Sequence, residues 1–84
     1  MSGSSYKELN TPVIGKVISR LRTEKGLSQE VLSGFAGLAR SHLAMIETGT
    51  KLPNFETLWR LAYALELKPH ELVAMIEVEL ITKP

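Results

Sequence analysis

The sequence predicts an all-α domain of five helices. Apolar residues recur at intervals of three and four along most of its 84 residues, which is the spacing of one face of a helix. Serine and asparagine caps, prolines and glycines mark the ends of these segments. Residues 78–82, VELIT, are β-branched enough to form a strand, but a helix is favoured there as well.

The first helix is predicted to begin at Pro12, with Thr11 as its N-cap, and to end at Gly26. Residues 1–10 precede it and are expected to form a flexible arm, whereas residues 11–84 are expected to form one domain. The apolar stripe of this helix is Ile14, Val17, Ile18 and Leu21.

Two short helices follow with almost no linker between them. Ser28 is the expected N-cap of the first, which ends at Gly37 because glycine accepts the left-handed conformation of a tight turn. The second begins near Ala39 or Arg40 and ends at Gly49. The apolar positions of the first helix are Val31, Leu32 and Phe35. In the second helix, Leu43 and Ile46 are expected to face the core.

Two further helices complete the chain. Asn54 is expected to cap a fourth helix, and Pro69 to begin a fifth that extends to about residue 81, with Glu71 favourable in its first turn. The core stripe of the fourth helix is Leu58, Leu61, Ala62 and Leu65.

The C-terminal helix is apolar on two sides. One stripe consists of Leu72, Val73, Ile76 and Leu80, and a second of Ala74, Val78 and Ile81. A helix that is apolar nearly all round must be buried nearly all round, so the second stripe is expected to form a two-fold homodimer interface or, alternatively, to fold back as core. Trp59 and Tyr63 lie off the core stripe of the fourth helix and either pack against the C-terminal helix or belong to a partner surface.

Composition excludes several classes of site. The chain has no cysteine, so it has no disulfide, thiolate metal site or cysteine nucleophile. His42 and His70 lack the spacing of metal ligands, and no catalytic constellation or phosphate-binding loop is present, so no metal, cofactor or enzymatic activity is expected. No apolar run approaches the ~20 residues of a membrane span, and a cytoplasmic location is expected.

The net charge of +1 is unevenly distributed. Residues 1–53 contain seven Lys and Arg against four Glu, whereas residues 54–84 contain three against five. The N-terminal part can therefore meet an anionic polymer while the C-terminal part meets protein, although so few charges are also compatible with chance.

The two short helices, about residues 28–48, match the helix-turn-helix unit, whose second helix enters the DNA major groove. Arg40 can bind O6 and N7 of guanine, Ser41 can donate or accept, and Met45 can contact a thymine methyl group. The outer face of the second helix consists of Arg40, Ser41, Ala44, Met45 and Thr48, which are small or flexible enough for close approach to the bases.

The sequence resembles the lambda-repressor-like, Cro/C1-type (XRE) helix-turn-helix domain. The resemblance extends from Ile14 to about Leu72 and is carried by LRTEKGLSQEVL, ARSHLAMIETG and LPNFETLWRLAYALELKPHEL. It implies a compact five-helix bundle that binds double-stranded DNA, with Arg40, Ser41, Ala44 and Met45 at base-reading positions. It also implies DNA-backbone contacts by Gln29, Thr48, Thr50, Lys51 and Asn54, to which we add His42, and a structural ion pair between Arg22 and Glu47.

Three departures from the family pattern affect these expectations. Ala39 replaces a capping Ser or Thr, so the helix that follows is expected to start less firmly. Val31 and Phe35 replace polar residues, which indicates either an extra buried contact or an exposed apolar spot. Met45 replaces a polar reader and leaves less hydrogen-bonded readout.

The predicted function is a sequence-specific transcriptional regulator, of repressor or controller type, that binds a palindromic operator as a homodimer. The alternative is an antitoxin-type protein-interaction module on the same fold, whose main partner is a toxin or another protein.

Overall fold

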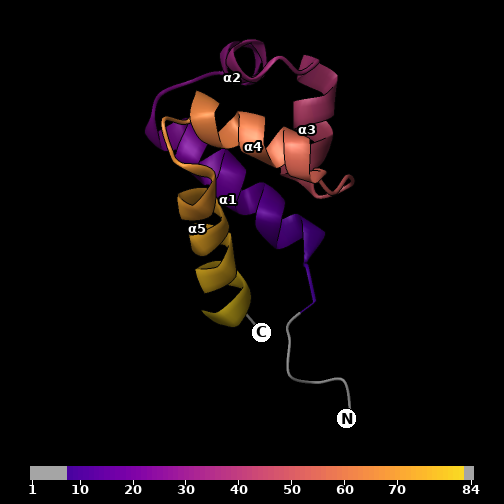
Figure 1. Ribbon diagram of the computed structural model, residues 1–84. Helices are drawn as coiled ribbons and strands as arrows, with labels where there is room; N and C mark the ends of the chain where they lie inside the picture. Colours follow the sequence, from indigo (N-terminus) through magenta and orange to yellow (C-terminus); the bar gives the residue numbers. More distant parts are fainter. Residues whose placement is uncertain (1–7, 83–84) are drawn as a thin grey trace.

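Five α-helices make up most of residues 8–82, the part of the chain that the computed structural model describes (Figure 1). This confirms the predicted all-α class, and residues 78–82 are helical. The bounds of the helices are α1 Thr11–Glu24, α2 Gln29–Ala36, α3 Arg40–Thr48, α4 Phe55–Ala64 and α5 Pro69–Thr82.

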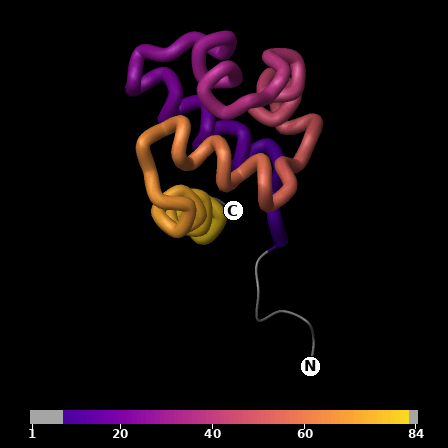
Figure 2. The backbone as a smooth tube through the Cα atoms, turned by 45° about the horizontal axis from the view of Figure 1, so that its top comes forward, coloured from indigo at the N-terminus to yellow at the C-terminus, as the bar shows by residue number. Residues whose placement is uncertain are grey.

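The helices surround one core. α1 packs against α3 and α5, and α4 packs against α2 and α5. α3 and α5 lie on opposite sides of the bundle, as Figure 2 shows in a view nearly along the axis of α5. Each helix contributes at least one side chain with no exposed surface, and burial of each such side chain favours folding by about 1.5–3 kcal/mol. These side chains include Ile18, Leu32, Leu43, Leu61 and Leu72.

The start of α1 differs from the prediction. Asn10, not Thr11, is the N-cap, and its side-chain oxygen accepts a hydrogen bond from the Val13 amide at 3.1 Å. Asparagine is the better cap, because its carbonyl oxygen reaches the first-turn amides readily. Asn10 therefore belongs to the folded domain. Glu8 and Leu9 of the predicted arm are exposed and lie outside the helix, and residues 1–7 lie outside the described residues.

Two apolar residues of α2 form an exposed apolar spot, which is one of the two alternatives expected from the sequence. Val31 and Phe35 expose 41% and 66% of their surfaces, and the inward positions are taken by Leu32, Ser33 and Ala36. The small Ser33 and Ala36 allow close packing against the neighbouring helices, and that packing turns residues 31 and 35 outward. Val73 of α5 is also exposed, so it does not belong to the core stripe of that helix.

α1 ends at Glu24 with Lys25 as its C-cap, and not at the predicted Gly26, whereas the caps and glycine ends predicted for α2, α3 and α4 agree with the structure. Ser28 and Asn54 accept hydrogen bonds from the amides of Val31 and Thr57, and so cap α2 and α4. Gly37 and Gly49 adopt left-handed conformations where α2 and α3 end.

Candidate nucleic-acid interface

The turn between α2 and α3 is three residues long. Gly37 ends α2 with φ of 70°, and the Leu38 amide donates to the Ser33 carbonyl at 2.8 Å. This pattern closes the C-terminus of α2 and sends the chain directly into α3. The geometry is that of a helix-turn-helix unit.

The inner face of α3 holds the helix firmly in place. Leu43 and Ile46 are completely buried. On the α1 side, Gly15 faces the backbone of the last turn of α3, and a Cβ added at Gly15 would come within 2.7 Å of the Glu47 carbonyl oxygen. Only glycine permits this close approach of the two helices.

The outer face of α3 is available to a partner. Arg40, Ser41 and Thr48 are exposed, Met45 exposes 42% of its surface, and Ala44 is half-buried between them. This face therefore presents one guanidinium, two hydroxyl groups and two short or flexible apolar groups. These are the side-chain types that read base edges in a major groove.

The N-terminus of α3 has no side-chain cap. Ala39 occupies the N-cap position, and only its carbonyl takes part, accepting from the His42 and Leu43 amides. The sequence predicted that Ala39 would not cap this helix as Ser or Thr would, and the structure has no side-chain cap there. The half-buried imidazole of His42 lies in the same first turn.

Arg22 and Glu47 join α1 to α3 in a two-bonded ion pair. Arg22 Nε lies 2.7 Å from Glu47 Oε2, and Arg22 Nη2 lies 3.0 Å from Oε1. The side chain of Glu47 is only 5% exposed, and its hydrogen bonds to Arg22 raise the pKa of the guanidinium. A third bond, from Arg22 Nη1 to the Leu27 carbonyl, ties the pair to the turn before α2.

Gln29 connects this ion pair to Arg40. Its Nε2 donates to Glu47 Oε1 at 3.0 Å, and its Oε1 accepts from Arg40 Nη1 at 3.3 Å. Sequence reasoning assigned Gln29 only to DNA phosphate and missed both contacts. Gln29 lies in α2 whereas both of its partners lie in α3, so no pattern within one helix reveals these contacts.

The loop after α3 gathers further polar groups. The hydroxyls of Thr48 and Thr50 both donate to the Met45 carbonyl, at 3.2 and 3.0 Å, so a phosphate oxygen would have to compete for these hydrogens. Lys51 is exposed in this loop. Asn54 uses its side-chain oxygen to cap α4, which leaves its amide nitrogen as a donor.

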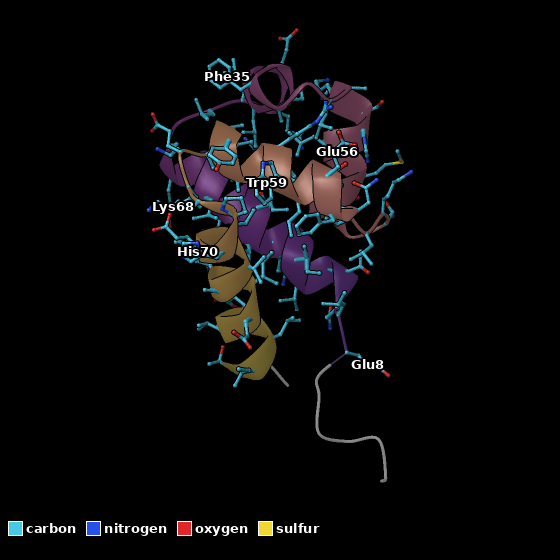
Figure 3. All side chains as sticks on the ribbon, in the orientation of Figure 1. Glu8, Phe35, Glu56, Trp59, Lys68 and His70 are labelled. Atoms are coloured by element: carbon cyan, nitrogen blue, oxygen red, sulfur yellow. The ribbon has the colours of Figure 1, made fainter. Side chains whose placement is uncertain are left out.

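A second surface, the aromatic groove, lies between α2 and α4. Phe35 borders it from α2 and Trp59 borders it from α4, and both are labelled in Figure 3. Tyr63 of α4 also borders it. Its volume is about 1020 Å³. Phe55, Trp59 and Tyr63 follow one another along α4 with ring centroids 5.8 Å apart, and all three are exposed. Trp59 and Tyr63 are thus not covered by α5, which was one of the two predicted alternatives.

The second stripe of α5 is also uncovered. Ala74, Val78 and Ile81 are exposed, the last two by 58% and 61%. The alternative in which this stripe folds back as core is therefore wrong.

Among the helices of residues 8–82, none is long and apolar enough to cross a membrane. Within the same residues, no group of three His, Asp or Glu side chains is placed to hold a metal ion.

The model of the helix-turn-helix family matches residues 18–72, which is more than half of the chain. This chain belongs to the Cro/C1-type helix-turn-helix family. It is a sequence-specific DNA-binding transcriptional regulator.

Two relatives of this helix-turn-helix protein have similar sequences. An uncharacterized HTH-type transcriptional regulator, y4dJ, of Sinorhizobium fredii is 39% identical over 61 residues, which cover 73% of this chain and 79% of the relative. The ImmF control region 10 kDa protein of Bacillus phage phi105 is 34% identical over 68 residues, covering 81% of this chain and 74% of that protein.

Solved structures also resemble this helix-turn-helix protein. The restriction-modification controller protein C.AhdI of Aeromonas hydrophila is 37% identical with a TM-score of 0.73, over 77% of this chain and 98% of the controller. The controller C.Esp1396I, as a tetramer on its natural 35 base-pair operator, has the same fold with a TM-score of 0.80 at 24% identity, over 90% and 100% of the two chains.

Proposed function

We propose that this protein is a controller-type transcriptional regulator that binds a palindromic operator as a homodimer, with α3 in the major groove. The observation that carries the proposal is the two-sided character of α3. Its inner face is locked by Leu43, Ile46 and the Gly15 contact, whereas its outer face exposes polar and flexible groups. A rigid helix with such a face is what major-groove readout requires.

The base-reading residues in this proposal are on the outer face of α3. Arg40 can donate two hydrogen bonds to guanine, Ser41 can donate or accept, and Met45 can contact a thymine methyl group. Ala44 lets the helix come close to the bases. The proposed readers are Arg40, Ser41, Ala44 and Met45.

The proposed phosphate contacts surround this face. Gln29 uses one N–H for Glu47 and has a second N–H for a phosphate oxygen. Lys51 supplies a positive charge, and the amide nitrogen of Asn54 is also a donor. The full set is Gln29, His42, Thr48, Thr50, Lys51 and Asn54.

The homodimer is proposed on the second stripe of α5. Ala74, Val78 and Ile81 expose apolar surface on a helix far from α3, and Trp59 and Tyr63 flank it in the proposal. The tetrameric assembly of C.Esp1396I on its operator, and the controller role of C.AhdI, agree with an oligomeric operator-binding protein. Such a regulator acts on DNA in the cytoplasm and has no catalytic role.

A duplex selection with the full-length protein tests this function. We expect an enriched site with two-fold symmetry and half-sites about 34 Å apart, one turn of DNA. Arg40→Ala should cost about 1–3 kcal/mol on the best site and relax base preference at one position per half-site. Lys51→Ala, the matched control, should weaken all sequences alike and reduce the log–log salt slope by about one. Selection without an enriched site would refute sequence-specific binding by this protein.

A second candidate function rests on the aromatic groove. Exposed aromatic side chains are enriched at protein interfaces, so an antitoxin-type role with a protein partner is the alternative. In that case Trp59→Ala should abolish partner binding while Arg40→Ala leaves it intact.

A further inference from the structure

The aromatic groove is lined by large exposed rings and by small residues. The rings belong to Phe35, Trp59 and Tyr63, and side chains of this kind dominate the energetics of protein interfaces. The small residues that line the groove are Gly34, Ala36, Gly37 and Ala64. Small residues let a neighbouring helix approach to an interaxial distance of about 8–10 Å. The groove therefore combines apolar anchors with room for another helix.

The rings on α4 recur with the repeat of a helix. Phe55, Trp59 and Tyr63 stand about one turn apart, and the centroids of neighbouring rings are separated by 5.8 Å. A helix lying along α4 presents an apolar group about every 5.4 Å, one per turn. Same-face residues of a strand recur about every 6.6 Å, and a polyproline helix repeats about every 9.3 Å. A helical partner thus matches the spacing of the rings most closely.

The other modes of peptide recognition fit this surface less well. Addition of a strand needs an exposed sheet edge, and residues 8–82 contain no strand. A helix bound in a groove needs only apolar contacts along one face, which the rings of α2 and α4 supply. None of the lining residues belongs to α3, so a partner helix and an operator would use different residues.

The charges beside the groove favour a basic partner. Lys25 is paired with Glu66 at 2.6 Å. Arg60 is paired with Glu56 at 3.0 Å. The carboxylate of Glu24, which also lines the groove, is 63% exposed, and its only basic contact within residues 8–82 is at 4.0 Å. A lysine or arginine of the partner would complement this carboxylate.

We propose that the aromatic groove binds one amphipathic helix of a partner protein. The bound helix has apolar residues at positions i, i+4 and i+7, and a lysine or arginine that reaches Glu24. This proposal rests on the second candidate function, in which the groove receives a protein, and gives that protein a stated chemistry. It does not depend on operator binding.

Peptide display tests the proposal without choosing a partner in advance. A library of random peptides of about 16 residues, enough for four helical turns, is selected against the full-length protein. Enriched peptides are then titrated while the emission of Trp59, the only tryptophan, is recorded. We expect sequences with apolar residues at helical spacing and a basic residue, and circular dichroism should show that they become helical on binding.

Gly34→Leu is the blocking variant. A Cβ at Gly34 meets no atom within 4 Å, so leucine enters the groove without displacing the protein, and it favours helix more than glycine does. Gly34→Leu and Trp59→Ala should each weaken binding of the enriched peptides by about 30-fold, the size of a hot-spot loss. Glu24→Gln should weaken it by about two- to five-fold, because the ion pair is exposed. Gly34→Ala is the matched control and should bind like the parent, and thermal unfolding verifies that each variant folds.

Several results would overturn the proposal. They are a selection without enrichment, enriched peptides that are proline-rich or alternate apolar and polar residues, and peptides whose binding Gly34→Leu leaves unchanged. If sedimentation shows that Gly34→Leu abolishes self-association, a second copy occupies the groove and the proposal fails.

Operator binding by the same variants separates this proposal from the regulator function. Retained operator binding by a protein that selects no peptide leaves the regulator intact and removes the antitoxin-type alternative. Conversely, selection of helical peptides by a protein that selects no duplex site supports the groove and counts against the regulator alone.

Discussion

Gly15 of α1 lies directly against the Glu47 carbonyl at the last turn of α3, with no room for a side chain between them. This contact sets the distance between the recognition helix and the helix that supports it. It also places Glu47 where Arg22 can bind both of its carboxylate oxygens.

Substitution of Gly15 should therefore separate the two helices. Gly15→Ala puts a Cβ against backbone atoms, which cannot rotate away, and should lower the free energy of unfolding by about 2–3 kcal/mol, as overpacked cores do. Gly34→Ala is the matched control, because a Cβ at Gly34 meets no atom within 4 Å and alanine favours helix. Urea unfolding compares the two. Equal stabilities for both variants would contradict the close contact.

The Arg22–Glu47 pair should matter more than an exposed pair. Glu47→Ala leaves a guanidinium without its partner in a site where the carboxylate is 5% exposed, and should cost about 2–4 kcal/mol. The control is Glu56→Ala, whose partner Arg60 lies on the same helix and whose side chain is 73% exposed, with an expected change within about 0.5 kcal/mol. A thermal midpoint of Glu47→Ala within a degree or two of the parent would show that the pair contributes little.

The uncapped start of α3 can be improved. Ala39→Ser supplies a side-chain oxygen for the first-turn amides and should raise the free energy of unfolding by about 1 kcal/mol. Ser28→Ala, at the cap of α2, removes an existing bond to the Val31 amide and should lower it by a similar amount. Chemical denaturation measures both. The prediction fails if Ala39→Ser leaves the free energy of unfolding unchanged while Ser28→Ala lowers it.

The dimer depends on exposed residues, so it can be broken without unfolding the chain. Val78→Asp with Ile81→Asp should give a folded monomer with much weaker operator binding, because an unpaired carboxylate at an apolar interface is costly. Sedimentation of the parent and the variant at tens of micromolar measures assembly. Leu72→Asp is the contrasting control and should unfold the protein, since Leu72 is completely buried. A parent protein that sediments only as a monomer would refute a stable dimer.

Much of the fold follows from local patterns in the sequence. The caps Ser28 and Asn54, the glycines that end α2 and α3, and the spacing of Leu43 and Ile46 depend on neighbours within one helical turn. Such features were predictable because propensity and hydrogen bonding act over a few residues. The outer face of α3 follows in the same way, since 100° per residue places it opposite the buried pair.

Other features depend on contacts between distant segments. Val31 and Phe35 have the apolar character of core residues, yet small side chains at 33 and 36 bring α2 close to its neighbours and turn 31 and 35 to the surface. The resemblance implied the Arg22–Glu47 pair, but the Gln29 bonds to Glu47 and Arg40 join α2 to α3 and leave no periodic trace in the sequence. By itself, the sequence determined the helices and the surface presented by α3. Only the tertiary structure decided which apolar groups are buried and how Arg40 is held, because both depend on the packing of helices that are separate in the sequence.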